Sequence, residues 1–291
     1  MHISFHLGAH YTDEDQLIRS LLKNGGAMTQ EGIALPGPGR YRGLMADVLV
    51  KLDGARADAE TQEMLFEAFV DNEDAKRLVL GHKNFLGAPH RALEHGQFYH
   101  LAKRNTQRLR YLFCDHTVSF FIGMRNPATF VPSVLSALSD AQRNAIMAQL
   151  DPRALFWSDI LLAIRESNPE TQITVWCDED TPLIWSDVMH AVSGIAPETP
   201  LEGSLDILEK ITHPDGMKRL TDYLQANPIQ NEGQRRRILT AFLDKYAIDS
   251  ELEMEIDLPG WSDQLVDDLT ATYDQDMDRI SHIPGVTLLT A

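Results

Sequence analysis

The pattern of hydrophobic and polar positions changes repeatedly between two periods along the first two thirds of the chain. Short apolar runs are typical of buried strands, and segments with apolar residues three and four positions apart are typical of amphipathic helices. The predicted strands cover 2–7, 76–81, 117–123 and 172–177, and the predicted helices cover 15–22, 41–52, 59–70, 98–113, 129–138, 140–150, 153–165 and 182–192. Strands that alternate with helices favour a parallel sheet, so we expect an α/β fold of three layers with a central, mostly parallel sheet flanked by helices.

Beyond residue 205 the pattern is mostly helical, with segments predicted at 216–225, 232–246 and 262–280. One stretch between them alternates strictly and predicts a half-exposed extended segment. Its apolar positions are Leu252, Met254, Ile256 and Leu258, and its acidic positions are Glu251, Glu253, Glu255 and Asp257. We expect a single domain over 1–291, in which 1–190 forms the core sheet with its helices and 191–291 is a mostly helical extension packed on that core.

Composition limits the classes of partner. The 291 residues are 43% hydrophobic, which is typical of an ordered globular protein, and carry a formal net charge of −17. This charge repels nucleic acid and anionic membranes unless a local basic patch overrides it. No apolar run reaches the ~18 residues of a membrane span, and the start lacks the basic and apolar regions of a secretory leader. We therefore expect a cytoplasmic protein with no nucleic-acid and no membrane partner.

Candidate chemistry lies where predicted strands end, because parallel sheets bind ligands at the carboxyl ends of their strands. Gly8 to Thr12 follow the first strand, and His82 with Lys83 follow the second. Arg125 follows the third, with Ser133 eight residues later on the next predicted helix. An arginine fork matches phosphate oxygens and a nearby serine adds a neutral donor, whereas a histidine is a natural general base.

Two of these segments resemble the sulfotransferase-like family of the P-loop fold, in particular its bacterial branch. The first loop matches the family's phosphate loop at four positions, namely His6, Gly8, His10 and Thr12, and the pair Arg125 and Ser133 matches the second phosphate signature in spacing and context. The resemblance implies transfer of a sulfuryl group from PAPS, phosphoadenosine phosphosulfate, to a hydroxyl or amine of a small-molecule or glycan-like acceptor. No metal is implied.

The resemblance also implies roles for individual residues. Arg125 and Ser133 would hold the ribose phosphate of PAPS, and the first loop would face its sulfate-bearing side. The candidate binding residues of that loop are Gly8, His10, Tyr11 and Thr12. His82 would be the general base and Lys83 would meet the sulfuryl or bridging oxygen. An ordinary alternative for Arg125 is a surface salt bridge at a strand end.

The first loop departs from the family pattern. Tyr11 stands where the phosphate-binding lysine belongs, and the acidic run Asp13 to Asp15 replaces glycine and hydroxyl residues. Thr12 and Asp15 also have the spacing of a helix capping box, which needs no ligand. A second hypothesis is therefore a catalytically inactive sulfotransferase-like protein with a binding or regulatory role. Transfer chemistry on another nucleotide or phosphate ester ranks last, because the chain has no Gly-x-x-x-x-Gly-Lys-Ser/Thr run.

Histidines and acidic residues were also weighed as metal ligands. Four histidines fall in one stretch, at His82, His90, His95 and His100, and an acidic turn covers 178–180. Their spacing matches none of the common ligand patterns, so we expect no metal site. The acidic turn is compatible both with a cationic acceptor and with the start of a helix.

Overall fold

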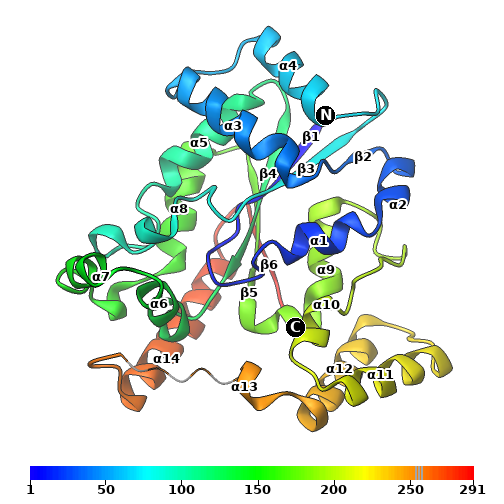
Figure 1. Cartoon of the computed structure of the whole chain (residues 1–291), viewed down its shortest axis with the longest axis vertical. Coiled ribbons are helices and arrows are strands. Elements are labelled where there is room, and N and C mark those ends of the chain that lie inside the picture. Colours follow the sequence, from blue (N-terminus) through cyan, green and yellow to red (C-terminus); the bar gives the residue numbers. More distant parts are fainter. Residues whose placement is uncertain (253, 255, 257) are drawn as a thin grey trace.

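Six parallel strands form the centre of the molecule (Figure 1). The computed structural model describes residues 1–252, 254, 256 and 258–291. The strands lie in the order β2-β3-β1-β4-β5-β6. Their bounds are His2–His6 for β1, Ile33–Ala34 for β2, Arg77–Gly81 for β3, Thr117–Met124 for β4, Gln172–Cys177 for β5 and Val286–Leu289 for β6. Every neighbouring pair runs in parallel, which confirms the predicted α/β fold with a parallel central sheet.

Helices cover both faces of the sheet because successive strand residues point to opposite sides. Phe120 packs in the core of one face and Phe121 in the core of the other. The Phe121 face is covered by α1 (Gln16–Leu22), α2 (Gly25–Gln30) and α9 (Thr181–Ser193). The Phe120 core takes in α3 (Pro38–Leu52), α4 (Ala59–Phe69), α5 (Ala102–Leu112), α6 (Pro127–Ser136), α7 (Asp140–Met147), α8 (Trp157–Ser167) and α14 (Asp263–Ser281). In Figure 1, α5 and α8 lie on one side of the strands, and α1 and α9 on the other.

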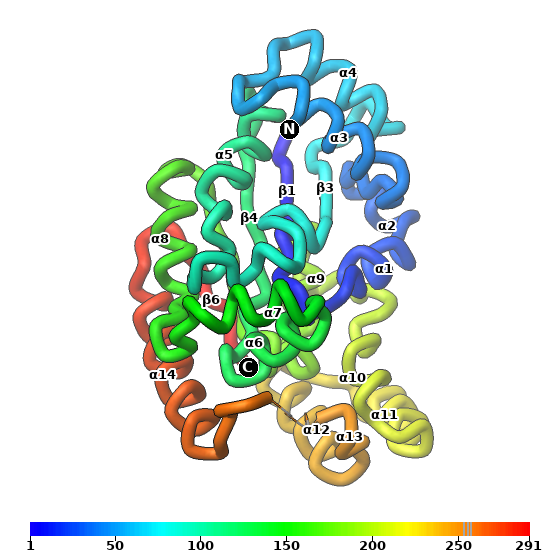
Figure 2. Tube along the Cα trace, turned by 60° about the vertical axis from the view of Figure 1, so that its left-hand side comes forward, coloured from blue at the N-terminus to red at the C-terminus, as the bar shows by residue number. Residues whose placement is uncertain are grey.

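The C-terminal region is mostly helical, as predicted, but it also supplies the sixth strand. Its helices are α10 (Asp206–Lys210), α11 (Pro214–Ala226), α12 (Glu232–Tyr246) and α13 (Asp249–Leu252). Figure 2 shows α11, α12 and α13 gathered at one end of the molecule. The extended segment predicted from residue 251 is wrong at its start, because Glu251 and Leu252 are helical. Three of its acidic positions, Glu253, Glu255 and Asp257, lie outside the described residues.

Two predicted helices begin later than expected. The helix predicted over 98–113 begins only at Ala102, because Tyr99 has a φ of 37° and its ring is buried in the turn before α5. The helix predicted over 153–165 is divided into a 3-10 turn at Pro152–Ala154 and α8, with Leu155 extended between them. Among the described residues, none of the helices combines the length and the apolar character needed to cross a lipid bilayer.

The helix after β4 contains an internal proline that another side chain compensates. Asn126 caps α6, since its side chain accepts a hydrogen bond from the amide of Ala128 at 2.9 Å. Pro132 therefore lies inside the helix and has no N–H for the carbonyl of Ala128. The indole Nε1 of Trp261 donates to that carbonyl instead, at 2.9 Å. This bond ties the segment that precedes α14 to the exit of β4.

The order of the strands places a crevice at the carboxyl ends of β1 and β4. The two strands are neighbours, with His2 to His6 beside Thr117 to Phe121. The chain leaves β1 towards α1 on one face and leaves β4 towards α6 on the other. Ligands in open parallel sheets bind where neighbouring connections diverge in this way. The segments after β1, β3, β4 and β5 therefore define the candidate site.

Candidate functional site

The segments that follow β1 and β3 touch each other. Gly8 has a φ of 67°, and a Cβ placed on it would lie 2.9 Å from the Cα of Lys83. Just before this crossing, the amide of His82 donates to the carbonyl of His6 at 3.2 Å. The structure thus brings Lys83 beside the first loop, and glycine is required at residue 8 both for its conformation and for the close approach.

The first loop contains several left-handed residues. Tyr11, Glu14 and Asp15 have φ values of 61°, 47° and 67°, a region that costs an ordinary residue about 1–2 kcal/mol. The loop supplies its own bonds: the amide of Tyr11 donates to Glu14 Oε1 at 3.0 Å, and the hydroxyl of Thr12 donates to the carbonyl of Ala9 at 2.7 Å. Such strain persists only where the surrounding structure enforces it.

The capping box predicted for Thr12 and Asp15 is wrong. Thr12 donates backwards to a loop carbonyl, and Asp15, the residue before α1, makes no side-chain cap bond. Asp13 takes that role, because its Oδ2 accepts a hydrogen bond from the amide of Leu17 at 2.8 Å. The acidic run therefore satisfies the start of α1 through a different residue from the one predicted.

Basic side chains around the first loop are paired with its carboxylates. Lys83 Nζ lies 2.5 Å from Glu14 Oε2, and Arg42 donates to both carboxylate oxygens of Asp15 at 3.0 and 2.7 Å. Burial disfavours the charge on Glu14, but the hydrogen bonds from Lys83 and from the amide of Tyr11 outweigh it and lower the pKa of this carboxyl group. Glu14 is therefore held in its charged form beside the lysine.

Arg125, at the exit of β4, reaches across to the first loop. Its Nη1 donates to the carbonyl of Tyr11 at 2.5 Å and its Nε to the hydroxyl of Thr129 at 3.0 Å. Within the described residues it forms no ion pair, so the salt-bridge alternative does not describe it. Its own carbonyl accepts a bond from the indole of Trp157 at 2.9 Å. The two sequence signatures are thus joined by a direct contact.

Ser133 lies one turn along α6 from Thr129 and is largely buried. Its hydroxyl donates to the carbonyl of Thr129 at 2.9 Å and lies 3.7 Å from the sulfur of Met254. Arg125 Nη2 lies 4.0 Å from the same sulfur. Arg125 and Ser133 therefore face a shared position, which the side chain of Met254 occupies.

A pocket of about 540 Å³ lies between the first loop, the exits of β4 and β5, and helices α10 and α13. Among the residues that the structure describes, two cationic side chains line it, Arg125 and Lys210. Five side chains with carboxyl groups line it as well, from Asp13, Glu14, Asp178, Glu179 and Glu251. The pocket is therefore predominantly acidic, in contrast to the basic surroundings expected of a site for PAPS.

Glu179 accepts a hydrogen bond from the backbone amide at the start of α6. Its Oε1 accepts a hydrogen bond from the amide of Asn126 at 2.8 Å, and its Oε2 accepts one from the hydroxyl of Tyr273 at 3.2 Å. Tyr273 comes from α14 and also donates to the carbonyl of Met124 at 3.1 Å. The C-terminal helix thereby fixes this carboxylate across the end of β4.

Asp178, the first residue after β5, has a carboxyl group whose pKa is raised into the neutral range. Burial, followed by the negative charge of Glu179, raises its pKa from 3.8 to about 8, although Arg125 acts in the opposite direction. Asp178 is therefore protonated at neutral pH and can donate as well as accept a proton.

Asp178→Asn is expected to stabilise the protein at pH 8 and to have little effect at pH 4. The folded protein keeps the Asp178 proton that the unfolded chain releases, so this group makes stability fall as the pH rises from about 4 to about 8. Asparagine cannot ionise, and because each unit of pKa difference corresponds to about 1.4 kcal/mol, the gain at pH 8 should be several kcal/mol. Urea unfolding at both pH values measures it. Asp222→Asn, at an exposed position of α11, is the control, and equal pH dependence of wild type and Asp178→Asn contradicts the prediction.

His82 lies in a different pocket from Arg125 and Ser133. Burial and the nearby charge of Arg42 lower its pKa to about 4, so the imidazole is neutral at physiological pH. It lines a cavity of about 270 Å³ together with Arg42, Asn84, Phe85 and Arg108 among others. Its Nδ1 is buried and has no partner among the described residues. A neutral imidazole is the form that a general base requires, but the structure does not bring it into the pocket beside Arg125.

His10 has a clear packing role. Its Nδ1 lies 2.8 Å from the hydroxyl of Tyr99 and its Nε2 lies 3.0 Å from Oδ1 of Asn84. The ring also stacks on Tyr99, with centroids 5.7 Å apart. Burial lowers the pKa of His10, which favours the neutral ring in this network. His10, predicted to belong to a phosphate-binding loop, thus packs beneath that loop and supports it.

Sequence reasoning missed three residues that shape the site: Arg42, Tyr99 and Trp157. Arg42 also donates to the carbonyl of Gly81, at 2.8 Å through Nη2, and so links α3 to the exit of β3. No local pattern around these residues marks them, because each acts on a segment distant in the sequence. The four histidines weighed as metal ligands do not gather together: His95 and His100 meet Glu94, whereas His82 lines its separate cavity.

Comparisons of the chain with protein-family models, with curated proteins and with solved structures found no match in any of the three. The likeness to sulfotransferases therefore depends on the residues of the first loop and on Arg125 and Ser133.

Proposed function

We propose that the chain is a sulfotransferase-like protein that binds a small ligand without using PAPS as a donor. One observation carries the proposal: backbone amides placed to hold an anion already donate to carboxylates of the chain. The amides of Tyr11 and Leu17 donate to Glu14 and Asp13, and the amide of Asn126 donates to Glu179. In a phosphate loop such amides donate to the oxygens of the bound phosphate, whereas here they donate to carboxylates of the chain itself.

Charge in the large pocket supports the same proposal. Two like charges 4 Å apart repel each other by about 4 kcal/mol at the effective dielectric constant of a protein surface. The phosphates of PAPS would meet several carboxylates in the pocket beside Arg125, and Lys83 is already paired with Glu14. A cationic ligand, such as a small amine, meets favourable charge there instead. From the acidic turn after β5, already considered for a cationic acceptor, Asp178 and Glu179 line this pocket, and Glu179 supplies a charged carboxylate.

The proposal is tested by removing the carboxylate of Glu14 and measuring whether phosphoadenosine phosphate then binds. Calorimetry with phosphoadenosine phosphate, the desulfated nucleotide, should give no binding to the wild type. The double variant Tyr11→Lys, Glu14→Gln restores a lysine in the loop and removes the charge that holds Lys83, so binding should become measurable and at least about 10-fold tighter than wild type, a change of about 1.4 kcal/mol.

Glu63→Gln is the matched control, since Glu63 is an exposed carboxylate on α4 outside the pocket, and this variant should bind no nucleotide. Wild-type protein that binds phosphoadenosine phosphate in the micromolar range, and loses binding in Arg125→Ala, contradicts the proposal.

A second candidate function is sulfuryl transfer itself, favoured by the contact between Arg125 and the first loop. In that reaction the acceptor oxygen or nitrogen attacks the sulfur of PAPS, the bond from sulfur to the bridging oxygen breaks, and the acceptor's proton passes to solvent water, because His82 lines a separate cavity. Turnover of PAPS by the wild type, abolished in Arg125→Ala, supports this candidate and excludes the binding protein.

A further inference from the structure

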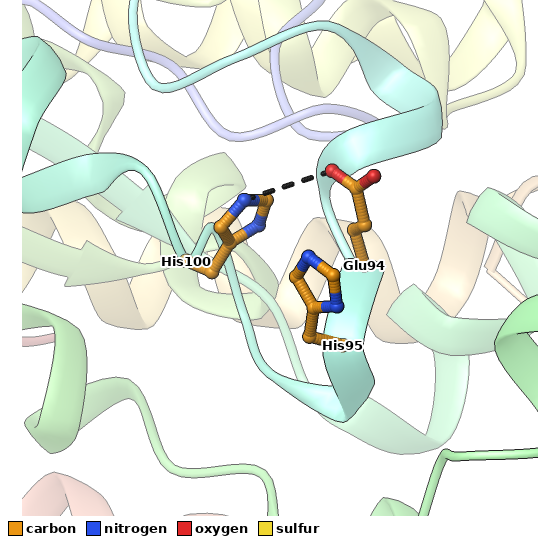
Figure 3. A group of neighbouring side chains, drawn as sticks. All are labelled: Glu94, His95 and His100. Atoms are coloured by element: carbon orange, nitrogen blue, oxygen red, sulfur yellow. Dashed lines mark ion pairs between the residues drawn. The ribbon is translucent and has the colours of Figure 1, made fainter.

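Three side chains of metal-ligating type meet in the turn between β3 and α5 (Figure 3). Glu94, His95 and His100 each offer one ligand atom, and these three atoms lie within 4.8 Å of one another. Glu94 Oε2 and His100 Nε2 are 3.6 Å apart, and the two imidazole rings lie 4.7 Å apart between centroids at an angle of 81°. This cluster is outside both pockets of the candidate site.

The backbone of the turn is strained in a way that brings the three side chains together. His95, Gly96 and Tyr99 have φ values of 62°, 67° and 37°. Two of them carry a Cβ, so each adopts a conformation that costs an ordinary residue about 1–2 kcal/mol. Gly96 packs so closely that a Cβ on it would lie 2.6 Å from the carbonyl oxygen of Gln149. Strain of this kind concentrates where a ligand is held.

Core contacts hold the turn in place. The ring of Phe98 stacks on Trp157 with centroids 4.4 Å apart, and the hydroxyl of Tyr99 accepts a hydrogen bond from the amide of His10 at 2.9 Å. The amide of Tyr99 donates to the carbonyl of Ala92 at 2.9 Å. The side chains of the cluster are therefore presented on a rigid support, which lowers the cost of ordering them around an ion.

The contacts of the cluster leave its ligand atoms available to an ion. The carboxylate of Glu94 lies 3.6 Å from His100 Nε2 and 3.9 Å from Arg91 Nε, so both are ion pairs beyond hydrogen-bond distance. The Nδ1 of His100 is buried without a partner among the described residues. A carboxylate and an imidazole without short hydrogen bonds can both turn towards a metal ion.

We infer that Glu94, His95 and His100 bind a zinc ion. Zinc takes imidazole nitrogen and carboxylate oxygen at about 2.0–2.2 Å, which puts the ligand atoms of a tetrahedral site about 3.4 Å apart. The separation between Glu94 and His100 meets this requirement, and His95 is exposed and free to rotate towards them. The fourth position opens on a cavity of about 390 Å³ that His95 and His100 line, so water or an external ligand completes the site.

Zinc is preferred over the hard cations because two of the three ligands are nitrogen. Magnesium and calcium take all-oxygen sites, whereas imidazole suits zinc, copper and nickel. The spacing Glu-His-x-x-x-x-His matches no common motif, which is why the sequence-based expectation was that no metal binds. The proposal does not depend on the function proposed for the large pocket, because none of its ligands lines that pocket.

Zinc titration of the metal-free full chain tests the site. Calorimetry on protein treated with a chelator should give one zinc ion per chain, with an affinity in the micromolar range or tighter. His95→Ala and Glu94→Gln should each weaken zinc binding at least about 10-fold. Loss of a residue that only hydrogen-bonds to a metal ligand already weakens binding by about this factor. Both positions are accessible to solvent, so the variants should fold, which circular dichroism verifies.

His90→Ala is the matched control, because His90 is an exposed histidine of the same segment outside the cluster. It should bind zinc as the wild type does, and magnesium and calcium should give no heat with any variant. The proposal is overturned if zinc does not bind, if His95→Ala and Glu94→Gln leave the affinity unchanged, or if His90→Ala weakens it as much as they do.

Discussion

Trp157→Ala is expected to lower the free energy of unfolding by about 3–5 kcal/mol, the usual cost of removing a buried aromatic side chain. Trp157 begins α8 and is 1% exposed. Its ring packs against Phe98, Phe130 and Tyr99, with centroids 4.4, 5.7 and 6.2 Å away. Alanine leaves a cavity among these rings and also leaves the carbonyl of Arg125 without its indole donor. Urea or thermal unfolding measures the loss.

Trp157→Phe separates the two contributions. Phenylalanine keeps most of the ring packing but cannot donate to Arg125, so this variant should lose about 1–2 kcal/mol. A loss below about 1 kcal/mol in Trp157→Ala, a size typical of an ordinary substitution, contradicts the structure around this residue. Since Trp157 contacts the turn that carries Glu94 to His100 as well as the strand exit at Arg125, both sites depend on its position.

Gly8→Ala is expected to destabilise the protein by about 2–5 kcal/mol. The left-handed φ of 67° costs an L residue about 1–2 kcal/mol. The added Cβ would also lie 2.9 Å from the Cα of Lys83, a backbone atom that moves only if the first loop separates from the exit of β3, and such overpacking costs about 1–3 kcal/mol. Thermal unfolding should show a decrease of about 2–4 °C for each kcal/mol lost.

Gly54→Ala is the control for the conformational contribution alone. Gly54 has a φ of 91°, but no atom of the described residues lies within 4 Å of the position of a Cβ, so this variant should lose only about 1–2 kcal/mol. Equal losses in Gly8→Ala and Gly54→Ala would mean that the first loop and Lys83 do not approach as closely as the structure has them.

The fold was largely predictable because its strands have strong local signals. The apolar runs of β3, β4 and β5 stand out from their surroundings, and the helices between them have regular apolar spacing. The apolar pattern did not predict β2, which has two residues, or β6, which has four. Neither is long enough to show a period, and each exists because a neighbouring strand offers it an edge to pair with.

The site was predictable as a location but not in its pairings. Strand ends pointed to the first loop and to Arg125, and the structure joins them through the carbonyl of Tyr11. The ion pair of Asp15 with Arg42 and the bond of Asn126 to Glu179 connect residues distant in the sequence. Such partners are decided only when the chain packs. A loop with the residue pattern of a phosphate loop can therefore have its donors paired with carboxylates of the same chain.

Trp261, whose indole donates to the carbonyl of Ala128, can serve as an intrinsic fluorescence probe. The other three tryptophans, Trp157, Trp176 and Trp185, are at most 2% exposed, whereas Trp261 is only half-buried. Trp261 follows Met254 in the chain, and the sulfur of Met254 lies 4.0 Å from Arg125 Nη2 and 3.7 Å from the hydroxyl of Ser133. A ligand that displaces the Met254 side chain therefore changes the polarity around one indole, and the wavelength of intrinsic fluorescence reports occupancy of the pocket without a label.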